Sequence, residues 1–176
     1  MRIDPWTPDA APRDEALVKS IEARRGGTLI NLDRMLLWSE PLARGWNTYL
    51  RALRQEISLS PFLRELAICV VARLSGAQYE YHHHAPELKK AGATDAQLAL
   101  LDDPDGAARS PLYDDLQRAV IAFAIASTRH VRIPDALFED LKRRLSATEL
   151  VELVASTAAY NMVARFLVAL DVTPED

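Results

Sequence analysis

The sequence has a single cysteine, Cys69, among its 176 residues. One thiol cannot close a disulfide within the chain, which excludes the small secreted proteins that depend on disulfides. The chain also lacks an uninterrupted run of roughly 18 apolar residues, so we expect no membrane-spanning segment. The N-terminal stretch MRIDPWTPDAAPRDE lacks the apolar core of a secretory signal. We therefore expect a cytoplasmic protein with no membrane partner.

Neither basic nor acidic residues are concentrated in one part of the chain. Lysine and arginine number 21 against 25 aspartates and glutamates, and the two kinds are interleaved. The pairs Arg24-Arg25 and Arg143-Arg144 lie close to acidic residues, which predicts solvated helix faces. Because no basic stripe is available to a phosphate backbone, we expect no nucleic-acid partner.

The sequence has no extended stretch in which apolar and polar residues alternate as in a β-strand, whereas apolar residues at helical spacing are frequent. The residues that follow Pro41 place an apolar side chain at Leu42, Trp46, Tyr49, Leu50 and Leu53. Since 49% of the residues are apolar, the chain has enough of them to form a core. We predict an all-α fold of about seven to nine helices.

Several helix boundaries are marked by capping residues. Ser60-Pro61 and Ser110-Pro111 each combine a hydroxyl cap with a proline at the first helical position, and Asn31 is a further candidate cap. The segments TDAQ and SATE match capping boxes that open helices. The intervening DDPDGAARS is predicted to be a loop. The Pro-rich residues 1–28 are predicted to form an N-terminal extension with one short helix, followed by a helical domain over residues 29–176.

The centre of the fold is predicted to be an antiparallel helix hairpin around Gly76. The segment PFLRELAICVVARLSG is apolar on nearly every side, which predicts a buried helix, and AQYEYHHHAPELKKAG follows the glycine. Glu65 is an acid within that apolar helix, where it needs a partner or a function. The hairpin is expected to bring Glu65 towards Glu80, and two nearby carboxyl groups shift each other's pKa apart.

Glu80 and His84 are spaced as neighbours on one helix face. A carboxylate at this spacing orients an imidazole and raises its pKa, as general acid–base catalysis requires, although an exposed ion pair has the same spacing. His82, His83 and His84 point about 100° apart on a helix and cannot share one metal ion, so we expect none. Cys69 is either a buried small side chain or a reactive thiol. Asn161 and Arg165 form either structural bonds or a substrate site.

The stretch RELAICVVARLSGAQYEYHHHAPELKKAGATDAQL resembles the signature region of the carboxymuconolactone decarboxylase family, whose fold is shared with the alkylhydroperoxidase AhpD. The likeness extends over about residues 30–170. It implies an AhpD-like helical subunit that assembles into a homotrimer or homohexamer. The peroxidase branch of the family uses a Glu, a CxxC pair and a His. Laid on this chain, the two cysteines fall on Ala77 and Glu80, so the thiols are missing.

The decarboxylase branch of the family has a Glu-x-x-x-His motif that matches Glu80 and His84. This resemblance implies a cofactor-free reaction on a small unsaturated carboxylic acid or lactone, with His84 as proton donor, Glu80 holding its tautomer and Glu65 as second acid or orienting group. An arginine, Arg165 or Arg73, would bind a carboxylate. Substrate contacts are expected from Tyr79, His83, Asn161 and Arg165. The alternatives are a non-catalytic helical oligomer that binds a small molecule and a redox protein that uses Cys69.

Overall fold

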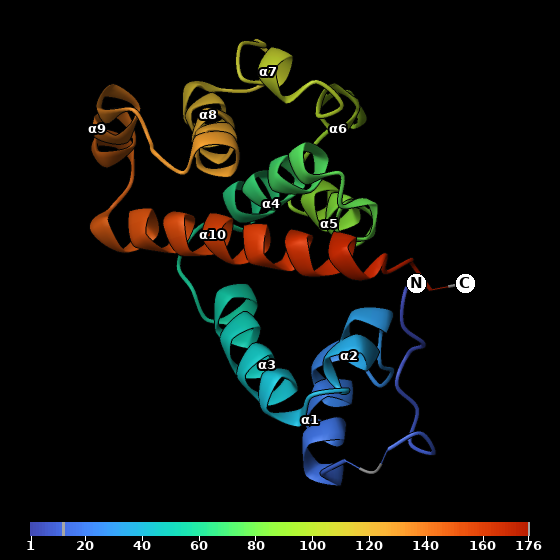
Figure 1. The fold of residues 1–176 in the computed structure, drawn as a ribbon. Coiled ribbons are helices and arrows are strands. Elements are labelled where there is room, and N and C mark those ends of the chain that lie inside the picture. Colours follow the sequence, from blue (N-terminus) through green and yellow to red (C-terminus); the bar gives the residue numbers. More distant parts are fainter. Residues whose placement is uncertain (12, 176) are drawn as a thin grey trace. The chain divides into compact units, whose positions relative to one another are not determined.

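The computed structural model describes residues 1–11 and 13–175 and contains ten α-helices and no strand within them (Figure 1). The all-α prediction is therefore confirmed, with one helix more than expected. The helices are α1 (Glu15–Arg25), α2 (Asn31–Leu36), α3 (Glu40–Gln55), α4 (Pro61–Ser75), α5 (Gln78–Lys90), α6 (Asp95–Leu100), α7 (Pro104–Ala107), α8 (Asp115–His130), α9 (Asp135–Arg144) and α10 (Ala147–Leu170).

The chain forms two compact units. The first comprises residues 1–57 and 170–176, and the second comprises residues 58–169. The predicted domain boundary after residue 28 coincides with neither limit, because α1 packs on α3 within the first unit. The domain boundary after residue 28 therefore stays a prediction.

The first unit contains a buried ion cluster that the sequence analysis missed. Asp33 on α2 is 2% exposed and accepts hydrogen bonds from Arg24 and Arg25 at 3.3 and 2.8 Å. The prediction that Arg24 and Arg25 lie on a solvated face is therefore wrong, because Asp33 draws both side chains inward. Asn31 is also not the cap that was predicted. It is the first helical residue of α2, and its side chain donates to the Thr173 carbonyl.

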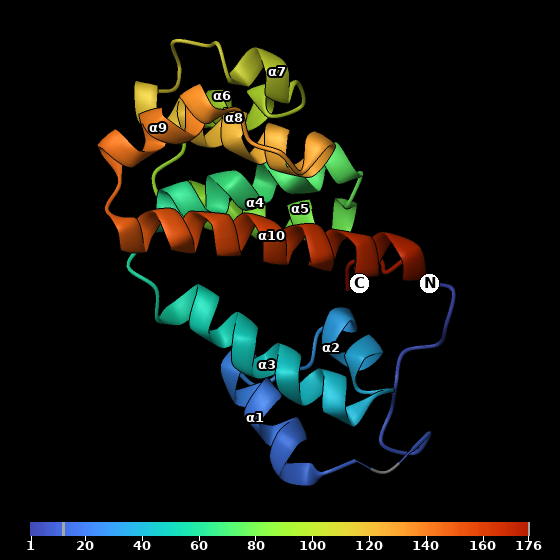
Figure 2. The same cartoon turned by 60° about the vertical axis from the view of Figure 1, so that its left-hand side comes forward.

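The second unit is built around α4, which packs against both α5 and α8. Every residue from Leu66 to Val71 is 0% exposed, as its uniformly apolar sequence predicted. Gly76 ends α4 in the left-handed region (φ 65°), which confirms the predicted hairpin with α5. The two views in Figures 1 and 2 show α10 running alongside this hairpin.

Two capping boxes appear as predicted, whereas the region between them differs. Thr94 with Gln97 and Ser146 with Glu149 exchange the expected hydrogen bonds. Residues 104–107 of the predicted loop form the short helix α7, capped by Asp103. The next helix begins at Asp115 rather than near Ser110, because Asp114 forms a capping box of its own. The capping box of Asp114, and not the Ser110-Pro111 pair, therefore determines where α8 begins.

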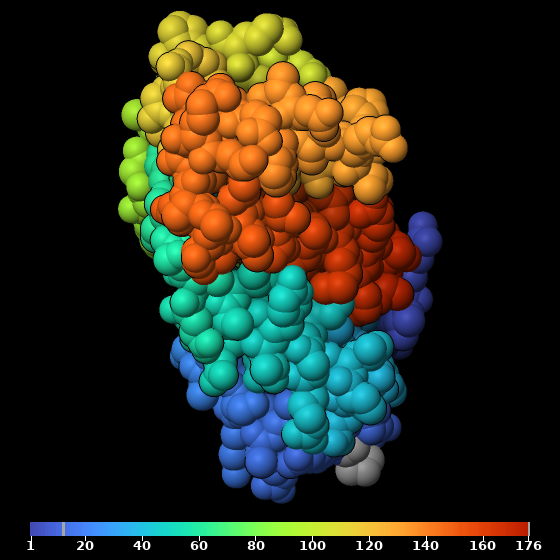
Figure 3. All heavy atoms as spheres, turned by 90° about the vertical axis from the view of Figure 1, so that its left-hand side faces the viewer, coloured from blue at the N-terminus to red at the C-terminus, as the bar shows by residue number. Residues whose placement is uncertain are grey.

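Helix α10 is the one described helix that is long and apolar enough to cross a membrane. Half of its most apolar window is buried inside the protein, and a long core helix meets the same criterion. Ser156, Thr157 and Asn161 are among its buried residues. In Figure 3 the side chains of α8, α9 and α10 lie against one another within the second unit. We therefore describe α10 as a core helix.

Val131 at the end of α8 generates a stability prediction. Its φ of 65° with ψ of −37° is strained for a β-branched residue, and its side chain is 83% exposed. We expect Val131→Gly to increase the free energy of unfolding by about 1 kcal/mol, because relief of the strain exceeds the entropy cost of glycine. Urea unfolding measures this change. Val131→Ala, which keeps a Cβ, should gain less, and a less stable glycine variant would refute the strain.

Candidate active site

The site begins with a hydrogen bond across the α4–α5 hairpin. Nδ1 of His84 on α5 lies 2.6 Å from Oε2 of Glu65 on α4, a hydrogen bond whose donor depends on the tautomer of the imidazole. Both residues are at most 5% exposed. The chain reversal at Gly76 brings these two helix faces together, so residues 19 positions apart become partners. The sequence analysis named Glu80 to hold the tautomer of His84 and Glu65 as second acid or orienting group, and the hydrogen bond to Nδ1 comes from Glu65.

Two residues outside the predicted set complete the surroundings of this pair. Arg64 donates from Nε to Oε1 of Glu65 at 3.1 Å, and its side chain is 13% exposed. The Tyr160 ring on α10 meets the His84 ring edge-on, with 4.8 Å between centroids. Arg64 could have been found from the sequence, because it is next to Glu65, an acid in an otherwise apolar helix. No local pattern links Tyr160 to His84, because α10 follows 57 residues after α5 ends.

Glu80 is a second buried carboxyl group, and its surroundings differ from those of Glu65. It is 2% exposed, and neither of its oxygens has a hydrogen-bond partner in the described protein. Burial raises the pKa of Glu80 well above its ordinary value of 4.5, because an ionised carboxylate loses its hydration there. Burial therefore favours the protonated form of Glu80, which can donate a proton.

Cys69 lies on α4, four residues after Glu65, and is 0% exposed. Burial raises the pKa of its thiol well above 9.0, and the charges of Glu65 and Glu80 raise it further. A thiol that stays protonated and covered is a poor nucleophile, which supports the interpretation of Cys69 as a core side chain.

The predicted substrate-binding residues are distributed around the site rather than gathered at one point. Tyr79 is buried and its ring lies 4.5 Å from that of His83, which is half-buried. Asn161 donates to Thr128 and to the Thr157 carbonyl. Arg165 donates to the carbonyl and side-chain oxygens of Asn161. The roles of these four residues in substrate binding remain predictions.

Arg73 is engaged at the far end of α4. Its guanidinium pairs with Asp102 at 2.5 Å and lies over the Tyr81 ring, 3.4 Å from the centroid. These contacts brace the hairpin against the α6–α7 connection. Arg64, rather than Arg73, is the arginine in contact with the Glu65–His84 pair.

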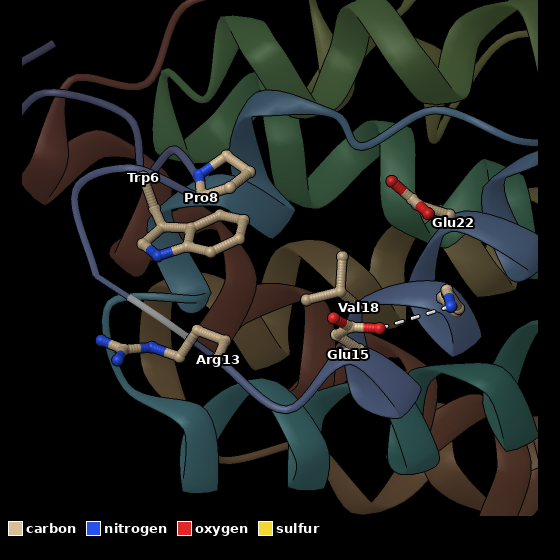
Figure 4. Close-up of a pocket in the computed structure, with 7 residues that line it drawn as sticks. Trp6, Pro8, Arg13, Glu15, Val18 and Glu22 are labelled. Carbon is tan, nitrogen blue, oxygen red and sulfur yellow. Dashed lines mark ion pairs between the residues drawn. The ribbon is translucent and has the colours of Figure 1, made fainter.

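Two surface cavities belong to the first unit and are separate from these residues. One, of about 330 Å³, is lined by Trp6, Pro8 and Val18 together with four charged side chains (Figure 4). Two of the four, Glu15 and Lys19, are 3.5 Å apart. The other cavity lies along α3 beside Gly45 and Tyr49. Within residues 1–11 and 13–175, no cluster of three or more His, Cys, Asp or Glu side chains could hold a metal ion.

The arrangement as a whole is suited to moving protons. The hydrogen bond from Glu65 to Nδ1 orients the imidazole and leaves Nε2 as the other ring nitrogen for proton exchange. Glu80, on the same face of α5 as His84, is a buried acid whose protonated form is favoured. The two carboxyl groups of the hairpin thus have different surroundings, since Glu65 has hydrogen-bond partners and the Glu80 oxygens have none among the described residues. Such a division is typical of acid–base sites.

Comparisons with known proteins agree with the fold. The sequence profile of the carboxymuconolactone decarboxylase family matches residues 40–108. No curated protein matches the chain in sequence. A peroxidase-related protein with an alkylhydroperoxidase AhpD core from Ralstonia eutropha superposes with a TM-score of 0.83 at 18% identity, over 99% of this chain and 92% of that one.

Two further solved structures are similar to this chain. A peroxidase-related protein from Silicibacter sp. has a TM-score of 0.77 at 18% identity and covers 99% of this chain and 89% of its own. The debrominase Bmp8, in complex with 2,3,4-tribromopyrrole, has a TM-score of 0.76 at 20% identity, with coverages of 99% and 92%. At these identities the likeness shows the AhpD-like fold alone.

The buried acid generates a prediction about stability and pH. Folded Glu80 keeps its proton, whereas the unfolded chain loses it above about pH 4.5, so rising pH favours unfolding. We expect Glu80→Gln to remove this loss. Relative to wild type, the variant should gain about 1.4 kcal/mol per pH unit above 4.5, until folded Glu80 ionises. Urea unfolding at pH 4.5 and pH 7 measures the difference, and an equal difference at both pH values would show that Glu80 is ionised in the folded protein.

Proposed function

Because the chain belongs to the carboxymuconolactone decarboxylase family, we propose that it is a cofactor-free lyase or isomerase. Its substrate in this proposal is a small unsaturated carboxylic acid or lactone. The observation that carries the proposal is the His84 imidazole, hydrogen-bonded to Glu65, on the same helix face as the buried acid Glu80, whose pKa is raised by burial. A debrominase of the same fold supports the idea that this helical scaffold holds a catalytic site.

The proposed reaction is the loss of CO2 from a carboxylate attached next to a conjugated carbonyl. The bond between the carboxylate carbon and the ring breaks, and its electron pair moves into the conjugated lactone carbonyl to give a dienolate. A proton from the protein then forms a C–H bond at the dienolate carbon. Solvent returns that proton to the donor, so each turnover consumes one proton and needs no redox partner.

We propose roles that differ in part from those implied by the resemblance. Because Glu65 is hydrogen-bonded to His84, we take it as the orienting group, and we assign proton donation to Glu80 and proton return to His84. A carboxylic acid that is neutral at pH 7 is a stronger donor than a neutral imidazole. Protonation of Glu80 also helps binding, because a substrate carboxylate then meets no second negative charge beside the Arg64–Glu65 pair.

Thiol peroxidase chemistry is not supported by the residues of the site. Ala77 and Glu80 stand where the resemblance places the two cysteines, so both the attacking and the resolving thiol are missing. Cys69 is fully buried with a raised pKa and has no second thiol in the chain. The redox alternative therefore has no nucleophile.

A non-catalytic small-molecule-binding protein is the second candidate function. The observation in its favour is burial, since Glu65, Glu80 and His84 are each at most 5% exposed. In this alternative the polar cluster specifies the packing of α4 on α5, and a ligand binds elsewhere without turnover. The two functions differ in whether His84 and Glu80 are required for chemistry.

We also propose that the protein is a cytoplasmic homotrimer or homohexamer. Helix α10 carries an exposed stripe of Val151, Val154, Ala158 and Met162 along one face. Residues at this spacing share one side of a helix, and a second copy would remove them from water. The free thiol of Cys69 agrees with a reducing compartment.

The proposed reaction is tested with carboxymuconolactone, whose loss is followed by ultraviolet absorbance. We expect wild type to turn it over, and His84→Ala and Glu80→Gln each to lower kcat by about 100-fold or more. His130→Ala, which removes an exposed histidine on α8, is the matched control and should keep full activity. Circular dichroism checks that each variant is folded. Absence of turnover in wild type would exclude this substrate, and active variants would remove the two residues from the mechanism.

The proposed assembly is tested by light scattering coupled to size-exclusion chromatography. We expect three or six times the subunit mass of 19.6 kDa for wild type. Met162→Lys should yield smaller species, because a charge on the stripe would be buried without a partner. Leu112→Lys is the control, since Leu112 is equally exposed but lies outside α10. A monomeric wild type would refute the assembly.

A further inference from the structure

One face of α1 borders the surface cavity of the first unit that Figure 4 shows. Glu15, Val18, Lys19 and Glu22 follow one another at i, i+3, i+4 and i+7, so they share one side of the helix. The cavity has a volume of about 330 Å³. This volume falls at the lower end of the range for pockets that bind small molecules, roughly 300–1,000 Å³. The cavity therefore has room for a small organic molecule.

The N-terminal segment forms a second wall of the cavity with Trp6 and Pro8. The indole N–H of Trp6 donates to the Ala11 carbonyl at 2.8 Å, and that of Trp38 donates to the Asp4 carbonyl at 2.9 Å. These hydrogen bonds fix the segment on both sides of Trp6. Trp6 itself is buried and Pro8 is exposed, so Pro8 presents the accessible apolar surface of this wall beside the indole (Figure 4).

Three of the four charged side chains of the lining already have partners. Lys19 and Glu15 form an ion pair with 3.5 Å between Nζ and Oε2. The guanidinium group of Arg13 donates to two backbone carbonyls of the α2–α3 connection, and in Figure 4 it points away from Val18. The fourth is Glu22, whose carboxylate has no hydrogen-bond or ion-pair partner in residues 1–11 and 13–175. Its charge is therefore open to a ligand.

We propose that this cavity binds a small primary amine that carries an apolar body, an arylalkyl or alkyl ammonium ion. In Figure 4 Val18 lies between Trp6 and Glu22, so the cavity has an apolar end and a carboxylate end. The apolar body contacts Pro8 and Val18, and the ammonium group donates a charge-assisted hydrogen bond to Glu22. This site is independent of the proposed reaction, because every residue that lines it belongs to the first unit.

Ligands of other charge fit the lining less well. A carboxylate would lie near Glu22, and two like charges at short range repel each other. The ammonium group of Lys19 does not offset this repulsion, because it is paired with Glu15. A neutral alcohol of the same shape would keep the apolar contacts and leave Glu22 without a cationic partner. The lining thus selects the ammonium ion by charge and the apolar body by contact.

The test is a titration of the full-length protein with 2-phenylethylamine at pH 7, followed by the indole ¹H–¹⁵N signals. The chain has three tryptophans, and Trp38→Phe and Trp46→Phe spectra identify the Trp6 signal by elimination. We expect the Trp6 signal to shift in a saturable manner. The neutral molecule of the same shape, 2-phenylethanol, should bind about fivefold more weakly, and 3-phenylpropionate should bind more weakly still.

The variant Glu22→Gln keeps the shape of the side chain and removes its charge. It should lower the affinity for 2-phenylethylamine about fivefold, to the level of the alcohol, and leave the affinity for the alcohol unchanged. Val18→Phe, which fills the cavity, should block both ligands. Glu56→Gln is the matched control, because it removes an exposed carboxylate at the end of α3, outside the cavity, and should change neither affinity.

Four results would overturn the proposal. They are a Trp6 signal without a saturable shift, an alcohol that binds as tightly as the amine, tighter binding of 3-phenylpropionate than of the amine, and a Glu22→Gln variant with wild-type affinity for the amine. Because Glu22 is only half-buried, Glu22→Gln should fold. The spectra of the ligand-free variants check this, and the comparison of amine with alcohol in wild type decides the matter without any variant.

Discussion

The hydrogen bond between Glu65 and His84 is the constraint on which the second unit depends. Helix α4 lies at the centre of that unit with a carboxyl group in its apolar surface, and a buried polar group needs a partner. His84 can reach Glu65 because the chain reverses at Gly76 and α5 returns along α4. Removal of one partner from a buried pair typically costs about 3–5 kcal/mol, so this bond also specifies how the hairpin packs.

The hairpin holds two buried carboxyl groups in different surroundings. Glu65 is hydrogen-bonded to Arg64 and His84, whereas neither oxygen of Glu80 has a hydrogen-bond partner among the described residues. The chemistry of the two side chains is the same, so the difference arises from their neighbours alone. Burial without a partner raises the pKa of Glu80 and favours its protonated form.

The same scaffold in relatives of the peroxidase branch carries thiols, by resemblance, at the positions of Ala77 and Glu80. In this chain the second of these positions is the buried acid Glu80, and His84 with its partner Glu65 occupies the matching positions of the histidine and the glutamate. Because one fold can host more than one chemistry, the fold alone does not define the reaction.

Much of the fold was predictable from the sequence because its signals are local. The hairpin, the burial of α4 and the capping boxes at Thr94 and Ser146 depend on residues within one or two helical turns. Long-range partners could not be predicted in this way. Asp33 on α2 binds Arg24 and Arg25 at the end of α1 and so buries their side chains. Asp114 caps α8, which therefore begins after Asp114 and not near Ser110.

For the site, the sequence by itself determined which residues matter: Glu65, Glu80 and His84 all lie in the buried hairpin, as their spacing from Gly76 predicted. Only the tertiary structure decided which of them pair. A helix places Glu80 and His84 on one face, but a hydrogen bond depends on the direction of each side chain. Packing of α5 on α4 turns His84 towards Glu65 and leaves the Glu80 oxygens without a described hydrogen-bond partner, which raises the pKa of Glu80.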